Sequence, residues 1–355
     1  MKEPAYQEAL SAFVNPPCEF SVEAVSGGLI NHSYKISKKQ NGPAFLLQQI
    51  NRQVFPDPEK LQENYQLLCQ YIKEKQLPFF IPAMDYFPGQ RSVYTDREQR
   101  CWRVFSFVEK TRTLYSTDQP EQAAAVAETF ARFTAAFSQM DSRRLHITIP
   151  GFHHVSNRFR QFRQALAGAS PQRLIKSGGL IRELNDREHY AQLYDAFTES
   201  TAFPLRVMHH DAKISNVLFD AGSGKVICPV DFDTVMPGYF FSDLGDMIRS
   251  MAGTADENSR DFGGLEIRPA IYQAILKGYL EGMSDFLTPE EKKYIHAAGL
   301  LLVYMQALRF LADYLNNDVY YRISYPGHNL DRAGNQLALL NKLEEFLADN
   351  YKFTC

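Results

Sequence analysis

Hydrophobic and polar residues change their spacing along the chain, and the change divides it into two parts. After a short N-terminal helix, the first hundred residues contain short runs rich in β-branched and aromatic residues, which are typical of strands. The predicted strands are residues 20–25, 33–36, 45–50, 91–95 and 101–108. The first part is therefore expected to be rich in β-structure.

One helix interrupts these strands at residues 57–75. Leu61, Tyr65, Leu68 and Ile72 lie on one face at helical spacing, and the segment starts with an aspartate and a proline, which favour a helix N-terminus. We predict an amphipathic helix packed against the strands.

From residue 119 onward the spacing is mainly helical. The predicted helices are residues 119–139, 155–167, 183–199, 267–281, 289–312 and 333–349. The first of them is rich in alanine and carries Val126, Phe130, Phe133 and Phe137 on one face, so we predict that it forms the buried spine of a helical lobe.

Two short apolar segments within the helical part have strand character. Residues 214–220 and 225–230 flank Gly222-Ser223-Gly224, a combination typical of a β-hairpin. A polar segment, residues 109–113, follows the strand predicted at residues 101–108 and is typical of a hinge between two lobes. We therefore divide the chain into a β-rich lobe, residues 1–108, and a larger, mainly helical lobe, residues 109–355, an α+β architecture.

Composition places the protein among ordinary globular proteins. Its 355 residues are 45% hydrophobic, enough to bury a core in one or two domains. A net charge of −3 and the lack of a Lys/Arg run give no attraction to nucleic acid or to an anionic membrane, so neither partner is expected. The longest apolar stretch, residues 299–305, is too short for a membrane span, and the N-terminus lacks a signal-peptide pattern.

The five cysteines are scattered and contain no Cys-x-x-Cys pair. This spacing argues against a zinc site or a redox motif, and the odd number argues against a disulfide framework. We expect reduced thiols, a cytoplasmic location and a monomer.

The segment from Val207 to Asp233 carries the chemistry. Asp211 follows His209 by two residues, Asn216 follows that aspartate by five, and Asp231 comes after the second strand of the hairpin. A hydroxyl that attacks the γ-phosphate of ATP needs a carboxylate base, and Mg²⁺ on the triphosphate takes carboxylate and amide oxygens. We predict Asp211 as the base and Asn216 and Asp231 as Mg²⁺ ligands of a kinase.

A single Asp or Asn at one of these positions is usually a turn former or a helix cap. Four matched positions on a hairpin favour a catalytic site. A catalytically inactive relative that binds ATP without turnover is the alternative left open.

The nucleotide contacts are expected in the β-rich lobe. Gly27 and Gly28 form a turn between two strands, where the backbone can approach phosphates. Gln48 occupies the strand position at which a protein kinase has a phosphate-holding lysine, and Glu63 on the following helix is either a nucleotide-facing residue or a solvated one. Backbone groups of Phe107, Val108 and Glu109 are predicted to bind the adenine edge.

These motifs resemble the aminoglycoside phosphotransferase and choline kinase superfamily, which shares the bilobal protein-kinase fold. Further segments are similar to the N-acetylhexosamine 1-kinase family over roughly residues 26–340. They are Gly28-Leu29-Ile30-Asn31, Leu47-Gln48-Gln49-Ile50-Asn51, Asp233-Thr234-Val235-Met236-Pro237-Gly238, residues 243–250, residues 308–315 and residues 328–332.

The resemblance implies transfer of the γ-phosphate of ATP to the anomeric hydroxyl of N-acetylglucosamine or N-acetylgalactosamine. Asp211 would act on that hydroxyl, and Lys213 would neutralise charge on the phosphate in flight.

It also implies sugar contacts from Asn31, His32, Arg309, Tyr320 and Tyr321. Two plainer interpretations stay open: Arg309 paired with Asp313 on its own helix, and His32 as an exposed loop residue.

Three residues are expected to support the site without touching substrate. His209, Asp233 and Asp246 would orient the catalytic loop and the metal ligands. The missing lysine at Gln48 leaves open how the nucleotide phosphates are held.

Two other function classes compete with the sugar kinase. The first is a kinase of another small alcohol, of the aminoglycoside, choline or homoserine type, because a fold does not fix its substrate. The second is a nucleotide-binding module or a protein-directed kinase, although no Ala-Pro-Glu-type segment follows Asp231. The gluco or galacto preference is also left open.

Overall fold

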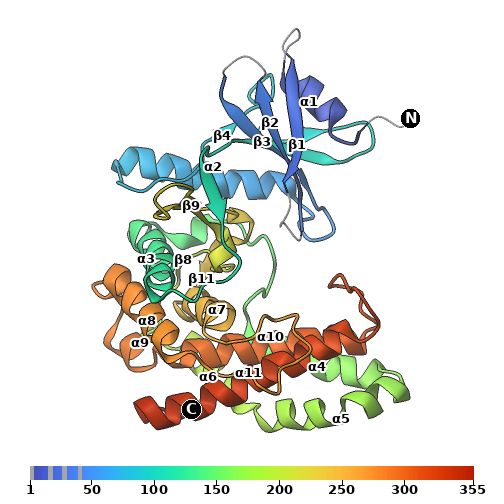
Figure 1. Cartoon of the computed structure of the whole chain (residues 1–355), viewed down its shortest axis with the longest axis vertical. Helices are drawn as coiled ribbons and strands as arrows, with labels where there is room; N and C mark the ends of the chain where they lie inside the picture. Colours follow the sequence, from blue (N-terminus) through green and yellow to red (C-terminus); the bar gives the residue numbers. More distant parts are fainter. Residues whose placement is uncertain (1–3, 15–18, 26–29, 39–41) are drawn as a thin grey trace. The chain divides into compact units, whose positions relative to one another are not determined.

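The computed structural model describes residues 4–14, 19–25, 30–38 and 42–355, which form two compact units (Figure 1). Unit 1 comprises Met1–Thr113, Arg143–Pro150 and Val217–Met236, and unit 2 comprises Leu114–Ser142, Gly151–Asn216 and Pro237–Cys355. The first boundary therefore follows Thr113 instead of residue 108, and two later segments of the chain belong to unit 1.

Unit 1 contains an antiparallel sheet with strand order β1-β2-β3-β6-β4, in which β5 also pairs with β6. The strands are β1 (Phe20–Val25), β2 (His32–Lys38), β3 (Ala44–Ile50), β4 (Met84–Asp85), β5 (Tyr94–Thr95) and β6 (Cys101–Ser106). The predictions for residues 20–25, 33–36 and 45–50 are confirmed. The strand predicted at 91–95 is only two residues long, and the one at 101–108 ends at Ser106.

The buried side chains of this unit form two clusters. One contains Ile36, Leu47, Trp102 and Val104 together with Ala9 and Leu10 of the short helix α1 (Gln7–Phe13). The other contains Ile50, Leu61 and Cys101.

The helix predicted at 57–75 is confirmed as α2 (Pro58–Lys75). Asp57 caps it by accepting the backbone N–H of Lys60 at 3.4 Å, and Leu61, Tyr65 and Leu68 are buried.

The predicted hairpin is also present in unit 1. β9 (Val217–Asp220) pairs antiparallel with β10 (Val226–Pro229), and Val217 lies opposite Pro229. The prediction of a hinge at residues 109–113 is wrong for its last three residues. Thr111–Thr113 forms strand β7 and pairs with β9, because the polar segment satisfies its backbone groups as an edge strand.

Unit 2 is helical. Its helices are α3 (Pro120–Ala136), α4 (Val155–Gly168), α5 (Pro171–Asp186), α6 (His189–Glu199), α7 (Phe241–Met251), α8 (Pro269–Met283), α9 (Pro289–Lys293), α10 (Ala297–Leu315) and α11 (His328–Tyr351). Short 3-10 helices cover Ser142–Arg144, Ile214–Asn216 and Phe232–Thr234, the last of them in unit 1. Strand β8 (Arg206–Met208) pairs with β11 (Met236–Gly238).

Most helix predictions hold, but two predicted helices are each a pair. Residues 183–199 span the end of α5 and all of α6, and residues 289–312 span α9 and most of α10. Neither break contains Gly or Pro, so hydrophobic spacing alone did not reveal where one helix ends and the next begins. Most of α5, and α7 as a whole, were not predicted.

Helix α3 is the buried spine that its alanine-rich face predicted. Val126, Phe130 and Phe133 are fully buried, and α8 packs along α3 at very short range. A Cβ added at Gly278 would lie 2.1 Å from the carbonyl oxygen of Ala124, so glycine is needed there for the two helices to approach.

Helix α10 is the one helix among the described residues that is long and apolar enough to cross a membrane by length and composition. Its most apolar stretch of 18 residues has a mean hydropathy of 1.3, but 89% of that stretch is buried inside the protein. It is thus the central core helix of unit 2, in contact with α11, α7 and α4.

Candidate active site

The predicted base lies on a short loop between β8 and the 3-10 helix Ile214–Asn216 in unit 2. The ammonium Nζ of Lys213 is 2.9 Å from Oδ2 of Asp211. The amide nitrogen of Asn216 donates to the same Oδ2 and to the backbone carbonyl of Asp211, each at 2.8 Å. The structure therefore brings together three of the predicted residues, Asp211, Lys213 and Asn216.

Electrostatics keep Asp211 ionised. Burial acts against the charged carboxylate, but the charge and hydrogen bond of Lys213, then His209 and the amide of Asn216, outweigh it and hold the pKa of Asp211 below its ordinary value. At neutral pH the carboxylate is available to accept a proton.

Asp243, on α7, holds the catalytic loop and was not predicted. Its carboxylate accepts the backbone N–H of His209 at 2.9 Å and that of His210 at 2.7 Å. The side chain is fully buried, and this burial raises the pKa of Asp243 to about 7 even though both N–H groups favour the carboxylate. Asp243 thus fixes the two residues that precede the base.

His210 has a strained backbone. Its φ is 63°, in the left-handed region that is uncommon for residues other than glycine. A Cβ added at Gly238 would lie 2.5 Å from Nε2 of His210, so the glycine of β11 makes room for this ring. The turn that presents Asp211 is therefore held by close packing as well as by Asp243.

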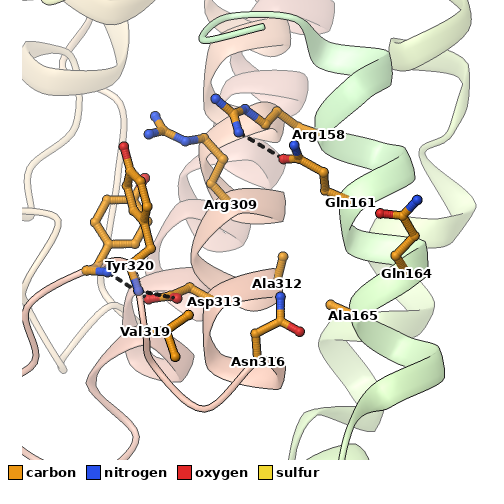
Figure 2. A pocket seen from close by; sticks show the side chains of 11 residues that line it. Arg158, Gln161, Gln164, Ala165, Arg309, Ala312, Asp313, Asn316, Val319 and Tyr320 are labelled. Atoms are coloured by element: carbon orange, nitrogen blue, oxygen red, sulfur yellow. Dashed lines mark hydrogen bonds between the residues drawn. The ribbon is translucent and has the colours of Figure 1, made fainter. Parts of the chain in front are cut away.

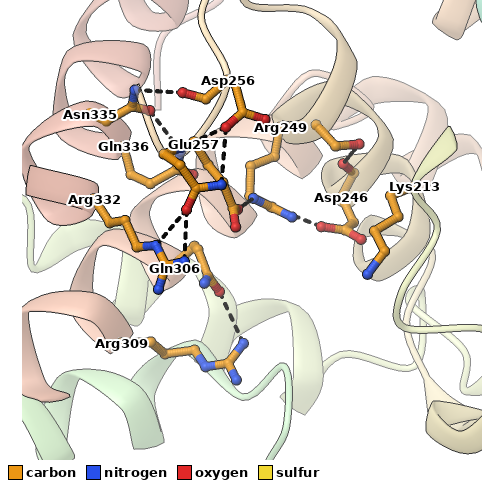
Figure 3. Close-up of polar contacts among 12 residues, drawn as sticks. Lys213, Asp246, Arg249, Asp256, Glu257, Gln306, Arg309, Arg332, Asn335 and Gln336 are labelled. Carbon is orange, nitrogen blue, oxygen red and sulfur yellow. Dashed lines mark hydrogen bonds and ion pairs between the residues drawn. The ribbon is translucent and has the colours of Figure 1, made fainter. Parts of the chain in front are cut away.

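His209 and Asp246, predicted to orient the loop, both lie within unit 2. The His209 ring is fully buried and meets Phe130 edge to face at 4.9 Å between centroids. Asp246 pairs with Nε of Arg249 at 2.8 Å, and Nη1 of Arg249 pairs with Glu257 at 2.7 Å (Figure 3). Burial raises the pKa of Asp246, against the influence of Arg249, while the nearby Asp211 adds to the rise.

The second metal-ligand candidate, Asp231, is in unit 1. It is exposed, has a φ of 64° and directly precedes the 3-10 helix Phe232–Thr234. The hairpin register brings the start of β9 and the end of β10 to the same end of the hairpin. Asn216 precedes β9 by one residue, and Asp231 follows β10 by two.

Asp233 is buried in a polar cluster of unit 1. Both nitrogens of the Arg103 guanidinium tip donate to its carboxylate, one of them at 2.9 Å, and the amide of Asn31 donates at 2.7 Å. Gln48 accepts from Nε of Arg103 at 3.1 Å and donates to Ser33 at 2.8 Å. Arg103, which lies opposite Gln48 on β6, was not singled out from the sequence.

The predicted N-terminal contacts are only partly described. Gly27 and Gly28 lie outside the described residues. Asn31 uses both ends of its amide inside unit 1, because it also accepts the backbone N–H of Asn51 at 3.0 Å. His32 is exposed at the start of β2, and their sugar contacts stay predictions.

Glu63 belongs to the surface. It is exposed and lies 2.6 Å from Nε2 of His146, in agreement with the plainer interpretation of a solvated helix face.

The segment predicted to bind adenine keeps part of its backbone available. The N–H of Phe107 already donates to Ala44 at 2.9 Å, and the carbonyl of Val108 accepts the Thr111 hydroxyl at 2.8 Å. The N–H groups of Val108 and Glu109 donate to no acceptor in the part of the chain that the structure describes. Hydrogen bonding to adenine from Phe107 N–H is thus disfavoured, while the two following N–H groups suit it.

The Asn216 side chain suits a magnesium ion that also binds phosphate oxygens. Both hydrogen bonds of this side chain use its nitrogen, so the amide oxygen faces away from Asp211 and accepts no hydrogen bond from a described residue. No cluster of three or more His, Cys, Asp or Glu side chains suited to a metal occurs among the described residues. Mg²⁺ needs only one or two protein oxygens when phosphates and water complete its shell.

A separate pocket of about 450 Å³ lies in unit 2 between α4, α10 and the loop after α10 (Figure 2). It is lined by Arg309, Tyr320 and Tyr321, all three predicted, and by Arg158, which was not. The alternative pairing of Arg309 with Asp313 is wrong, because Asp313 accepts the backbone N–H groups of Tyr320 at 2.8 Å and Tyr321 at 2.9 Å.

Comparisons with known proteins agree with this geometry. The APH model, described as the phosphotransferase enzyme family, matches residues 21–290. An aminoglycoside phosphotransferase from Alicyclobacillus acidocaldarius subsp. acidocaldarius superimposes with a TM-score of 0.61 at 15% identity over 98% of this chain and 96% of that one.

Two further structures are similar. A microcompartment-associated aminopropanol kinase has a TM-score of 0.61 at 14% identity over 97% of each chain. A spectinomycin phosphotransferase, solved with ADP and spectinomycin, has a TM-score of 0.53 at 11% identity over 93% of this chain and 92% of that one. These likenesses confirm the predicted α+β fold with a β-rich and a helical lobe.

Proposed function

The chain belongs to the phosphotransferase enzyme family, and from this premise we propose that it transfers the γ-phosphate of ATP to the anomeric hydroxyl of an N-acetylhexosamine, giving the sugar 1-phosphate. The observation that carries the phosphotransfer is the Asp211 carboxylate, ionised and held by Lys213 and Asn216. The sugar specificity rests on the segments that resemble N-acetylhexosamine 1-kinases, above all residues 233–238 and 308–315.

In the proposed reaction Asp211 orients the C1 hydroxyl and accepts its proton. The hydroxyl oxygen forms a bond to the γ-phosphorus, and the bond from that phosphorus to the β–γ bridging oxygen breaks, so ADP leaves. Asn216 and Asp231 would hold Mg²⁺, which neutralises the triphosphate when bound.

Lys213 has two proposed roles. Its ammonium lowers the pKa of Asp211, and during the reaction it would neutralise charge on the transferred phosphoryl group. His209, Asp233 and Asp246 are proposed to hold the loop and the metal ligands in place, and Asp243 joins them because it binds the loop backbone directly.

We propose that ATP binds at unit 1 and the sugar at unit 2. The phosphates would lie against Gly27 and Gly28, with Gln48 nearby, and the adenine against Val108 and Glu109. A relative solved with ADP supports a nucleotide co-substrate.

In unit 2 the sugar would meet Arg309, Tyr320 and Tyr321, and the resemblance adds Asn31 and His32 of unit 1 as proposed sugar contacts. The guanidinium of Arg309 packs over the Phe152, Tyr320 and Tyr321 rings at 4.9, 5.9 and 5.4 Å, so it stands rigidly among aromatic faces. We further propose a monomeric enzyme of the cytoplasm.

The second candidate is a kinase of another small alcohol, since a similar structure is named an aminopropanol kinase. Cationic acceptors such as amino alcohols are held by carboxylates and aromatic rings. The pocket instead presents two arginines, and Asp313, its one carboxylate, binds backbone N–H groups. We therefore rank the sugar kinase first.

The test is ADP release with Mg²⁺-ATP over N-acetylglucosamine, N-acetylgalactosamine, glucose, choline and kanamycin, with the reducing end of each sugar followed in parallel. Phosphorylation at C1 removes the reducing end, whereas phosphorylation elsewhere leaves it. ADP release matched by loss of the reducing end supports the proposal. ADP release with the reducing end intact, or with choline or kanamycin alone, contradicts it.

A further inference from the structure

Arg158 and Arg309 are two half-buried arginines that face the same pocket without a carboxylate partner. Figure 2 shows their guanidinium groups near each other at one end of that pocket. Arg158 donates to the side chain of Gln161 at 2.8 Å and to the carbonyl of Phe152 at 3.0 and 3.2 Å, and Arg309 donates to Gln306 at 2.9 Å. All of these acceptors are neutral.

Several other buried or half-buried arginines of the protein are paired with carboxylates. Arg103 pairs with Asp233, Arg206 with Glu291, Arg249 with Asp246 and Glu257, Arg187 with Glu344, and Arg173 with Asp318. Among the described residues, neither Arg158 nor Arg309 lies within 4.0 Å of a carboxylate. In this pocket the fold leaves two adjacent cations without a carboxylate partner.

The two charges influence each other electrostatically. Burial, and then the neighbouring Arg309 cation, lower the pKa of Arg158 to about 10. Asp313 does not relieve the repulsion, since its carboxylate accepts two backbone N–H groups and the amide of Asn329 at 2.9 Å. A negatively charged ligand in the pocket would relieve the repulsion between the two arginines.

Hydrogen-bonding capacity also remains. A guanidinium has five N–H donors, of which Arg158 uses three and Arg309 uses one within the protein. The remaining donors of two forked groups match the oxygens of a carboxylate or a phosphate, and such charge-assisted bonds are among the strongest in proteins.

The pocket is connected to the catalytic loop through Phe152. This ring lies under Arg309, with the guanidinium 4.9 Å from its centroid, and its centroid is 6.4 Å from that of His210, the residue before Asp211. Its backbone carbonyl binds Arg158. One residue thus links both arginines to the loop that carries Asp211.

We propose that the acceptor carries an anionic group, a carboxylate or a phosphate, which Arg158 and Arg309 bind together at the end remote from the phosphorylated hydroxyl. This inference rests on the proposed function, because it names a subclass of acceptor for the same site. It makes Arg158 a specificity-determining residue.

The experiment compares a neutral acceptor with two derivatives that each carry an added anionic group. The probes are N-acetylglucosamine, its 6-phosphate and its 3-O-carboxymethyl ether, and the proteins are wild type, Arg158→Gln and Arg160→Gln. Arg160 is exposed on the same helix, away from the pocket lining, and serves as the matched control. The readouts are kcat/KM from ADP release and, without ATP, the Kd of each probe by calorimetry.

In the wild type we expect at least one anionic acceptor to exceed the neutral sugar about 10-fold or more in kcat/KM, as charge-assisted hydrogen bonds would give. Arg158→Gln should bring this ratio to about 1, while Arg160→Gln keeps it. A preference for the carboxylate over the phosphate, or the reverse, identifies the anion. A wild-type ratio of about 1 or below with both anions, or a preference that Arg158→Gln retains, overturns the inference.

The binding measurement separates this inference from the proposed function. If no sugar is phosphorylated, the proposed function fails, and the Kd values alone decide the inference. Tighter binding of an anionic probe that is lost in Arg158→Gln supports an anion site. Equal binding of all three probes to the wild type refutes it.

Discussion

The buried pair of Arg103 and Asp233 gives a prediction with a clear magnitude. Their side chains are 4% and 6% exposed, so Arg103→Met would leave a buried carboxylate with only Asn31 as a side-chain donor. Removal of one partner of a buried ion pair costs about 3–5 kcal/mol. We expect the free energy of unfolding of unit 1 to fall by that amount.

The assay is urea unfolding followed by tryptophan fluorescence. Trp102 is the only tryptophan of the chain, is fully buried and precedes Arg103 on β6, so it reports directly on this sheet. The double variant Arg103→Met/Asp233→Leu should recover most of the loss, because it removes both charges. Lys60→Met, which breaks an exposed pair with Asp57, should leave the midpoint unchanged. A loss below about 1 kcal/mol in Arg103→Met, or no recovery in the double variant, would refute the reasoning.

Three further outcomes follow from the catalytic loop. Gly238→Ala should lower kcat by about 10-fold or more, because the added Cβ would displace the ring of His210, the residue that precedes Asp211. Steady-state kinetics together with a melting curve check this prediction. Lys213→Met should move the acid limb of the pH profile of kcat/KM to higher pH. The reason is that the ammonium holds the pKa of Asp211 low, and the carboxylate is lost as pH falls through that pKa. An acid limb that does not move argues against Asp211 as the base. Asp243→Ala should cost about 2–5 kcal/mol of stability, measured by denaturant unfolding, by leaving two buried N–H groups without an acceptor.

Hydrophobic spacing predicted the elements whose buried face is continuous. Helix α3 is an example, since it presents an uninterrupted apolar side to its unit. Helix α7 was missed because its buried face includes the polar residues Ser242, Asp243 and Asp246. These bind His153, the loop before Asp211, and Arg249, respectively, instead of contributing apolar surface. The part of α5 before residue 183 was missed because it is largely exposed and contains Gly178 and Gly179, which lower helix propensity.

The catalytic loop could be predicted because its spacing is local. Asp211, Lys213 and Asn216 lie within six residues, so a short turn is enough to bring them together. Arg103 could not be predicted in the same way, since its partner Asp233 is 130 positions away and the two meet only through the tertiary packing of unit 1. Arg158 likewise needed the packing of α4 on α10 to be recognised.

The central claim is that Asp211 is the base of a phosphotransfer, and Asp211→Asn tests it most directly. Asparagine keeps the shape and can still accept hydrogen bonds from Lys213 and Asn216, but it cannot take up a proton from the acceptor. With Mg²⁺-ATP and N-acetylglucosamine, we expect kcat to fall by about 10²-fold or more while the melting temperature stays close to that of the wild type. A folded Asp211→Asn variant that retains near-wild-type turnover would contradict the account.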